Sequence, residues 1–389
     1  MIFNIAQHAS YKTILSRKEK EKMKFNIETK TLLSAVNNVS KVIDKVSPLP
    51  ALANLKIVTE EKSIIITGSN GTASMQQTLP MDTGIEECGQ CLVDSKYFSE
   101  IIRKVSGQFV DIQCVDNLMN IKCGKAKFKL TCTDVSEYPA IDLDTPANKL
   151  SCPSETLCAA FEKVLICVAN GDNNRPVLNG VRLSINSGQV MILGTDSYRL
   201  NQYAFIDMDC KDVGITIPRQ ACNEFLKMAK DKVSVYYNEN KVQFKTEYVI
   251  YQSQLLSGVF PDVTRITPKS CPYCVEVDKA ELLEAVKRCD FVKSDEGKQI
   301  IHLSFDTCDS HIDSKSVEIG ETYEELESVQ MMSDPIEFNL NGKYLRDALE
   351  SINSDKVIIK TPGVDKPLIV RGSDEGIKLM SVLVPVRTH

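Results

Sequence analysis

The chain has 389 residues, too many for one ordinary domain, and this length suggests two or three. Hydrophobic residues make up 43% and charged residues 25%, which suits a soluble protein with packed cores. No apolar run approaches the roughly 18 residues that a membrane span needs. The formal net charge of −6 argues weakly against nucleic-acid binding, but allows a protein whose positive charge is confined to one face.

The first 22 residues differ from the rest. They end in the charged run Ser16 to Lys22, and their apolar content is too broken for a secretory signal. We expect residues 1–22 to be a disordered leader or the product of an upstream start codon, with a functional arm as the alternative. Without a signal peptide, the 14 cysteines indicate reduced thiols in the cytoplasm, and several lie in apolar runs where cysteine packs as a small hydrophobic residue.

Three helical segments recur at a constant spacing. Their second residues, Leu32, Leu157 and Leu282, are each 125 positions apart. The segments are Thr31 to Val36, Thr156 to Phe161 and Glu281 to Val286. Each follows a short run typical of a strand: Lys24 to Ile27, Lys149 to Cys152, and Cys274 to Val277. The spacing predicts an internal repeat.

A second helix recurs with the same period. Ile102, Phe225 and Leu349 each lie eight residues before a strand valine. Those valines are Val110, Val233 and Val357, and their offsets of 123 and 124 match the first set. Two independent anchors therefore give one period.

Each unit is predicted to run strand, helix, several strands, helix, several strands. Both helices are amphipathic, so we predict α+β domains in which two helices pack on antiparallel sheets. Proline and polar residues cluster near Ala147 and again from Pro268 to Pro272. We therefore place three domains at residues 23–147, 148–271 and 272–389.

Several motifs resemble one family. Thr195 to Leu200, reading Thr-Asp-Ser-Tyr-Arg-Leu, is similar to the Thr-Asp-x-His-Arg-Leu signature in the middle domain of the bacterial DNA polymerase III beta subunit, the DNA sliding clamp. Further segments match the family in order and spacing from Met23 to Arg387: Met23 to Phe25, Pro48 to Pro50, Arg175 to Val181, Gly258 to Asp262, and Met380 to Arg387. Tyr198 departs from the family's histidine.

The resemblance implies the DNA clamp fold and a head-to-tail homodimeric ring of six similar units, with helices lining the hole and sheets outside. It implies a non-catalytic processivity subunit that encircles double-stranded DNA regardless of sequence and tethers the replicative polymerase. Its expected partners are a second copy, the polymerase catalytic subunit, an ATP-driven clamp loader, and replication and repair proteins bound through short linear motifs.

Helices that face DNA need cations directed at phosphate without base readout. Basic side chains on or near the predicted helices are the DNA-binding candidates: Lys45, Arg103, Lys104, Arg175, Arg219 and Lys227. On charge alone, solvated helix faces are the favoured explanation for them. The resemblance favours a DNA role, most directly for Arg219 and Lys227.

The resemblance also implies a peptide-binding pocket between the middle and last domains. Aliphatic side chains would form its floor, and arginines would supply polar anchors at the rim. By matched position its residues are Leu178, Thr195, Ser197, Tyr198, Arg199, Leu200, Pro261, Arg265, Ile266, Val382, Leu383, Val384, Pro385, Val386 and Arg387. The alternative is that Val382 to Val386 is only a last strand packed in the core. Both are compatible, because a strand has two faces.

The family pairs an edge strand of the first domain with the last domain of the other chain. The matching strand is Ala126 to Leu130, so Phe128 and Leu130 are expected to face Phe291 and Val292 of the second copy. Ordinary packing within the domain is the alternative.

Two Cys-x-x-Cys pairs, Cys88 with Cys91 and Cys271 with Cys274, would suit zinc if they met in space. They are 180 residues apart, and the repeat places one before a helix and the other in a linker. We therefore predict no metal site. A redox role is also disfavoured, because neither pair follows a strand and opens a helix.

Enzyme signatures are missing from the sequence. The four histidines are scattered at His8, His302, His311 and His389, and the chain has no phosphate-binding glycine loop or nucleophile elbow. We predict no catalysis and no cofactor. Two alternatives remain: a non-DNA scaffold built from the same repeats, and a thiol or zinc enzyme. Cations gathered on inward helix faces would exclude the first, and bound zinc in the purified protein would favour the second.

Overall fold

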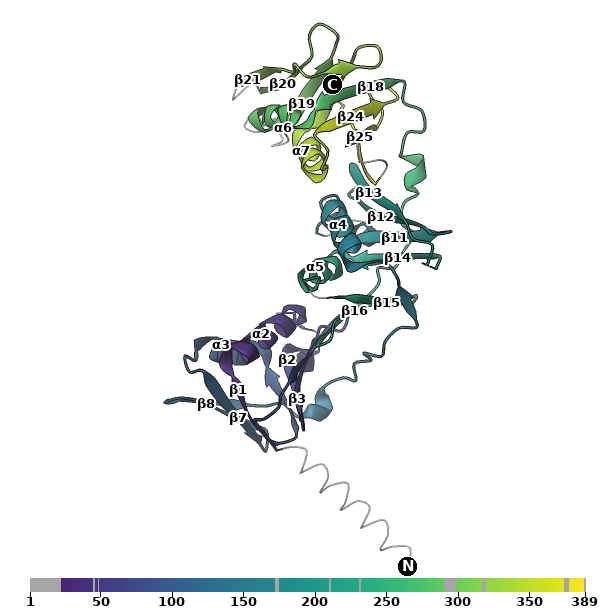
Figure 1. Cartoon of the computed structure of the whole chain (residues 1–389). Helices are drawn as coiled ribbons and strands as arrows, with labels where there is room; N and C mark the ends of the chain where they lie inside the picture. Colours follow the sequence, from purple (N-terminus) through teal and green to yellow (C-terminus); the bar gives the residue numbers. More distant parts are fainter. Residues whose placement is uncertain are drawn as a thin grey trace, which may run out of the picture. The chain divides into compact units, whose positions relative to one another are not determined.

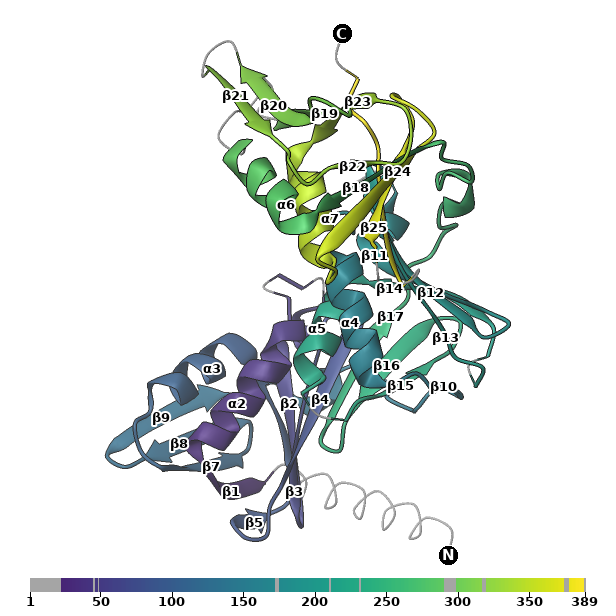
Figure 2. The ribbon, with the colours of Figure 1, turned by 45° about the horizontal axis from the view of Figure 1, so that its top comes forward.

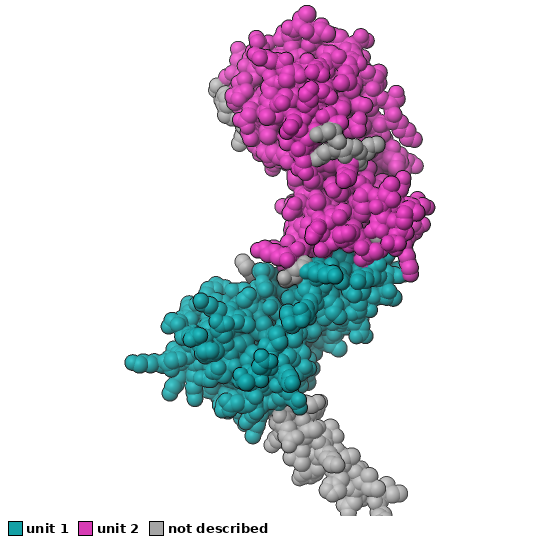
Figure 3. Space-filling model, in the orientation of Figure 1, with its two compact units in different colours: residues 1–149, 231–254 teal, residues 150–230, 255–389 magenta. Residues whose placement is uncertain are grey.

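The structure, a computed structural model, describes residues 22–44, 46–47, 49–171, 175–209, 211–230, 232–289, 299–316, 320–373 and 378–387 (Figure 1). The chain divides into two compact units: residues 1–149 with 231–254, and residues 150–230 with 255–389 (Figure 3). Apart from Lys22, the predicted leader lies outside the described residues. None of the helices in the described ranges has the length and apolar character needed to cross a bilayer.

The predicted order of elements occurs three times, so the α+β repeat is confirmed. The first copy comprises β1 (Met23–Glu28), α2 (Thr29–Val39), η1 (Ser40–Val42), η2 (Pro50–Ala53), β2 (Asn54–Glu60), β3 (Ser63–Ser69), β4 (Ala73–Pro80), β5 (Ile85–Glu87), β6 (Gln90–Asp94), α3 (Ser95–Lys104), β7 (Phe109–Val115), β8 (Leu118–Cys123), β9 (Ala126–Thr131) and η3 (Val135–Glu137).

The second copy comprises β10 (Asn148–Leu150), α4 (Ser154–Leu165), η4 (Pro176–Asn179), β11 (Gly180–Asn186), β12 (Gln189–Thr195), β13 (Arg199–Ile206), β14 (Val213–Pro218), α5 (Arg219–Met228), β15 (Ser234–Tyr237), β16 (Lys241–Lys245), β17 (Val249–Gln254) and η5 (Val263–Arg265). The third comprises β18 (Tyr273–Asp278), α6 (Lys279–Arg288), β19 (Ile300–Phe305), β20 (His311–Ser316), β21 (Gly320–Glu325), β22 (Gln330–Met331), β23 (Ile336–Asn341), α7 (Gly342–Ser351), β24 (Lys356–Thr361), β25 (Leu368–Gly372) and β26 (Leu379–Leu383).

The repeat anchors found in the sequence occupy equivalent buried positions. The residues that set the period, three in the first helices and three in the second, are all at most 1% exposed: Leu32, Leu157, Leu282, Ile102, Phe225 and Leu349. The helices form contacting pairs, α2 with α3, α4 with α5, and α6 with α7 (Figure 2). Each pair buries its apolar face against its own sheets, and that burial drives the helices to form.

The first unit contains two sheets. A five-stranded sheet runs β5-β1-β7-β8-β9, and an eight-stranded sheet runs β10-β15-β16-β17-β4-β3-β2-β6. Strand β17 pairs antiparallel with β4, with Tyr251 opposite Met75. Strands of the second repeat therefore extend a sheet of the first, which explains why residues 231–254 belong to this unit.

The second unit is built in the same way. A nine-stranded sheet runs β14-β11-β12-β13-β26-β25-β24-β18-β22, and a four-stranded sheet runs β21-β20-β19-β23. Strand β26 of the third repeat pairs with β13 of the second. This pairing brings the end of the described chain onto the middle repeat.

Candidate functional site

Side chains of the turn between β12 and β13 hold its backbone. The Asp196 carboxylate accepts hydrogen bonds from the backbone N–H groups of Tyr198 and Arg199, both at 3.0 Å. The Thr195 hydroxyl donates to the Arg199 carbonyl at 2.7 Å and accepts from the Ser197 N–H at 3.1 Å. Ser197 has a φ of +80°, in the left-handed region. The motif that identified the family is therefore a rigid turn.

The Arg199 guanidinium is fully engaged inside the protein. Its Nε lies 3.0 Å from Asp196 Oδ2, and its Nη1 lies 2.5 Å from Asp347 Oδ2 on α7. Its Nη2 donates to the Ile166 carbonyl at 2.8 Å, and its carbon lies 4.4 Å from the centre of the Tyr344 ring. The expected role as a polar anchor at the rim does not match this geometry. Arg199 instead fixes the turn against α7 and the end of α4.

The last strand differs from its expected extent. We expected it over Val382 to Val386, but β26 ends at Leu383. Leu383 lies opposite Arg199, the first residue of β13, so the chain beyond it has no strand to pair with on that side. Pro385 also lacks the N–H that a strand ladder requires.

Two backbone hydrogen bonds nevertheless hold the tail after β26. The Val384 N–H donates to the Tyr198 carbonyl at 3.0 Å, and the Val386 N–H donates to the Asn339 carbonyl at 2.8 Å. The tail is thereby fixed to the turn of the second repeat and to β23 of the third.

The predicted pocket residues divide into a buried base and an accessible rim. Buried are Leu178, Thr195, Leu200, Val382 and Leu383. Half-buried are Arg199, Pro261, Val384, Pro385 and Val386, and exposed are Ser197, Tyr198, Arg265, Ile266 and Arg387. Leu200 and Val382 pack with Leu193, Val263 and Met380 in one cluster. A cavity of about 1200 Å³ lies elsewhere in this unit, and none of the predicted residues lines it.

We call the accessible side chains of Tyr198, Ile266, Val384, Pro385 and Val386 the tail surface. Tyr198 is 64% exposed and Ile266 37%, which is high for large apolar side chains. The sequence did not indicate which groups would stiffen this surface, because they come from the third repeat and no local motif marks them. The most important are Asp347, Tyr344 and Asn339.

Four of the predicted DNA-binding cations are exposed, three of them at the ends of helices. Arg103 and Lys104 lie in the last turn of α3, where Arg103 Nη2 is 3.5 Å from Asn37 Oδ1 and Lys104 is 75% exposed. Lys227, in the last turn of α5, is 55% exposed and pairs with Glu224 at 2.5 Å. Arg103 and Lys104 can swing toward a phosphate at small cost, since exposed pairs are weak. Lys227 would have to leave the Glu224 carboxylate, which is only 7% exposed, so its move costs more.

Arg219 is placed differently. Its Nη1 donates to the backbone carbonyls of Leu165 at 3.0 Å and Val168 at 2.8 Å. It therefore adds hydrogen bonds to carbonyls at and just beyond the carboxyl end of α4, where the helical ladder runs out. Arg175 is exposed, and Lys45 lies outside the described residues.

The predicted seam strand is an edge strand. Strand β9 ends the five-stranded sheet, with Phe128 and Leu130 half-buried and Lys127 and Lys129 exposed. The expected partner positions, Phe291 and Val292, lie outside the described residues. Strand β21 is likewise outermost in its sheet and carries glutamates.

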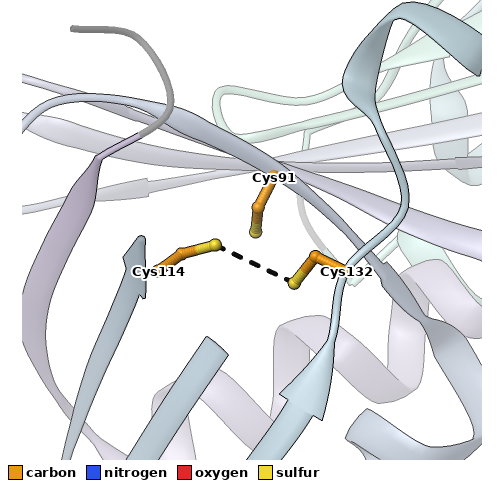
Figure 4. A group of neighbouring side chains, drawn as sticks. All are labelled: Cys91, Cys114 and Cys132. Atoms are coloured by element: carbon orange, nitrogen blue, oxygen red, sulfur yellow. Dashed lines mark hydrogen bonds between the residues drawn. The ribbon is translucent and has the colours of Figure 1, made fainter. Parts of the chain in front are cut away.

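The thiols group in a way that the Cys-x-x-Cys spacing does not predict. Cys88 is exposed, whereas Cys91 is buried with Cys114 and Cys132, their sulfurs lying within 4.8 Å of one another (Figure 4). Hydrogen bonding with Cys132 and Cys91 lowers the pKa of Cys114. Hydrogen bonds to Cys114 and Cys132, together with burial, raise the pKa of Cys91.

Two of the histidines lie close together, although their sequence positions had suggested that all four are scattered. His302 on β19 and His311 on β20 have ring centres 6.2 Å apart. Asp313 lies 2.7 Å from His302 and 3.7 Å from His311. Cross-strand pairing creates this group, because His302 lies opposite Asp313.

Comparison with known proteins identifies relatives over nearly the whole chain. The beta sliding clamps of Bacillus subtilis (strain 168) and Staphylococcus aureus (strain Mu50) are each 27% identical over 381 residues, covering 94% of this chain and 100% of the relative. The crystal structure of the Bacillus subtilis DNA polymerase sliding clamp is 26% identical, with a TM-score of 0.87 and the same coverage. The DNA polymerase III beta chain of Streptococcus pneumoniae TIGR4, at 23% identity, has the same TM-score of 0.87 and shares the fold.

Family models give the same result domain by domain. Those described as the N-terminal, central and C-terminal domains of the DNA polymerase III beta subunit match residues 23–142, 151–262 and 264–387. Together these matches extend over most of the chain and confirm the resemblance drawn from its motifs. The chain belongs to the DNA polymerase III beta subunit family, the non-catalytic sliding clamps that make DNA replication processive.

Proposed function

We propose that two copies of this chain close head to tail into a ring around duplex DNA and tether the replicative polymerase to it. The observation that carries the proposal is the threefold repeat of a helix pair on antiparallel sheets, matched in order by three clamp domains. Near-equal units are what a closed ring of six needs. The three domains would be residues 23–147, 148–271 and 272–389, and the protein would act in the cytoplasm, where bacterial DNA is replicated.

The seam would join β9 of one copy to the third domain of the other. Edge strands carry unpaired N–H and C=O groups, and β9 and β21 are both outermost in their sheets. Lys127 and Lys129 on β9 complement Glu321 and Glu325 on β21, so opposite charges would meet along the new ladder. Phe128 and Leu130 would then pack toward the partner's third domain, with Phe291 and Val292 as the partner positions.

DNA would be held by topology and by weak phosphate contacts. Arg103, Lys104, Arg175 and Lys227 are the exposed candidates, and Lys45 is a further candidate from the family match. The remaining candidate, Arg219 on α5, would instead stabilise the α4–α5 pair through its hydrogen bonds to the end of α4. Contacts of this kind carry no sequence information, as sliding requires.

Partners would dock on the tail surface by short linear motifs. These partners are the polymerase catalytic subunit, an ATP-driven clamp loader, and other replication and repair proteins. Exposed Tyr198 and Ile266 and half-buried Val384 to Val386 offer apolar area to one or two large anchors of a peptide. Arg265 and Arg387 are both exposed and would add polar contacts to such a peptide.

Retention on DNA tests the ring directly. Once loaded by its clamp loader onto nicked circular DNA, the protein is expected to stay bound and to leave after the circle is linearised. A surface binder would leave both forms equally, because its affinity does not depend on closure of the DNA. Native mass spectrometry at micromolar concentration is the second test, and it should detect a dimer of two 43.4 kDa chains. A monomer alone would contradict the ring.

A further inference from the structure

Three cysteines far apart in the sequence converge in the first unit. Cys91, Cys114 and Cys132 are 2%, 2% and 5% exposed. The sulfurs of Cys114 and Cys132 are 3.9 Å apart, and all three lie within 4.8 Å of one another. Figure 4 shows the three side chains directed at a common point. Among the described residues, no fourth cysteine, histidine or carboxylate joins the group.

The group lies where the two sheets of this unit meet. Cys91 is on β6 in the eight-stranded sheet, and Cys114 is on β7 in the five-stranded sheet. Cys132 follows β9, where the chain crosses between the sheets: its N–H bonds the Asn117 carbonyl, and the next residue, Thr133, bonds Leu92 on β6. Both flanking bonds fix the backbone of Cys132, so its sulfur is held toward the other two.

Small hydrophobic packing explains each buried cysteine separately, but not their convergence. Cys222 and Cys289 are equally buried, and neither belongs to a group of metal-binding side chains within the described residues. In the trio, the sulfurs of the three side chains point toward one another (Figure 4).

We propose that Cys91, Cys114 and Cys132 form a binding site for a thiophilic metal ion of the Zn²⁺ class, which ties the two sheets of the first unit together. Sulfurs bound at about 2.3 Å to one zinc ion lie about 3.8 Å apart, close to the separation of Cys114 and Cys132. Thiolate ligands select soft and borderline ions over Mg²⁺ or Ca²⁺. The inference is independent of the proposed ring, because the site lies within one chain.

Binding exchanges protons for metal. Each sulfur that coordinates as a thiolate releases its proton to solvent and donates an electron pair to the ion. Two thiolates neutralise a divalent ion, so a buried site is expected to release at least two protons for each ion bound. The reaction needs no oxidant, in contrast to a disulfide between Cys114 and Cys132.

Titration of the metal-free, reduced full-length protein with Cd²⁺, a spectroscopic substitute for Zn²⁺, tests the site. We expect one ion per chain, ultraviolet charge-transfer absorption from sulfur to metal, and proton release in weakly buffered solution. Cys91→Ala, Cys114→Ala and Cys132→Ala should each weaken binding more than about tenfold, since even outer-shell changes cost that much. Cys88→Ala, in the same Cys-x-x-Cys motif, and Cys123→Ala, buried on β8 of the five-stranded sheet, should bind as the unaltered protein does.

A measurement on the unaltered protein keeps the proposal testable even if the cysteine variants fail to fold. Because an ion that binds only the folded state stabilises it, Zn²⁺ should raise the thermal unfolding midpoint and a chelator should reverse the rise. Two outcomes would overturn the proposal: no charge-transfer absorption together with an unchanged midpoint, or binding lost in the Cys88 variant but kept in the trio variants. Loss of ring closure on DNA, with metal binding intact, would contradict only the proposed function.

Discussion

Arg199 and Asp347 form an ion pair at 2.5 Å that joins the turn of the second repeat to α7 of the third. Both side chains are largely covered, 10% and 16% exposed. Arg199 is also bonded to Asp196 and to the Ile166 carbonyl, so its donors face inward on three sides. We therefore predict that Arg199 acts as a positioning residue, and that its substitution affects the fold before it affects peptide binding.

Arg199→Ala is therefore expected to destabilise the protein by about 3–5 kcal/mol, because it leaves the carboxylate of Asp347 covered and unpaired. The measurement is urea unfolding followed by far-ultraviolet circular dichroism. Arg265→Ala is the matched control: Arg265 is 85% exposed and pairs only with Asp262 among the described residues. It should leave the unfolding midpoint unchanged but weaken binding of a polymerase peptide. Equal effects of both variants on stability would contradict the positioning role.

Substitution of the exposed cations should weaken DNA binding without changing its sequence preference. Each of Arg103→Ala, Lys104→Ala and Lys227→Ala removes about one phosphate contact, so the slope of log affinity against log salt should fall by about one. Fluorescence anisotropy with two unrelated duplexes measures both quantities. Lys62→Ala, in the turn between β2 and β3, is the control and should change neither. A loss confined to one duplex would argue for base readout.

The seam predicts a charge effect on dimerisation. Lys127→Glu with Lys129→Glu would place like charges against β21 and should raise the dimer dissociation constant, most strongly at low salt. Sedimentation velocity measures the change. Adding Glu321→Lys and Glu325→Lys should restore the dimer, since the pattern is then reversed on both sides. If the fourfold variant dimerised as weakly as the double variant, β21 would not be the partner of β9.

High pH should destabilise the fold through buried neutral groups. Burial raises the pKa of Cys167 to about 12 and that of Tyr138 to about 12. Because the folded-state pKa is above the unfolded one, this stability is complete below about pH 9 and is lost as pH rises toward 12. In Cys167→Ala the unfolding midpoint, measured in reductant from pH 7 to about 10.5, should fall less steeply than in the unaltered protein. An exposed control, Cys308→Ala, should retain the full slope.

The sequence was sufficient to predict the repeat, because buried helix positions recur with one period. Leu32, Leu157 and Leu282 indicate the first helix of each copy by their spacing alone, and all three are buried. The turn at Thr195 could also be recognised from the sequence, since its Asp and Thr side chains bond the backbone of the same turn. Local chemistry of this kind leaves a local signature.

Contacts between distant segments left no such signature. Nothing around Asp347 indicates that it meets Arg199, 148 positions away. Cys91 was visible only as half of a Cys-x-x-Cys pair, yet its neighbours are Cys114 and Cys132. The strand-like run at Val382 also misled, because the apolar residues continue past Leu383, where the partner strand does not. Strand pairing and sheet crossing decide these positions, and neither is encoded by neighbouring residues.

The tail surface gives the last prediction. Deleting Val384 to His389 removes two backbone bonds, to Tyr198 and Asn339, and the apolar rim beside them. Each bond contributes about 1 kcal/mol, so the truncated protein should remain folded and dimeric, since the proposed seam lies on β9 and β21. Binding of polymerase and loader peptides, measured by fluorescence polarisation, should be abolished. A shorter deletion, of Thr388 and His389 only, keeps both bonds and should bind normally. Unchanged affinity in the longer deletion would mean that the tail is structural and that partners dock elsewhere.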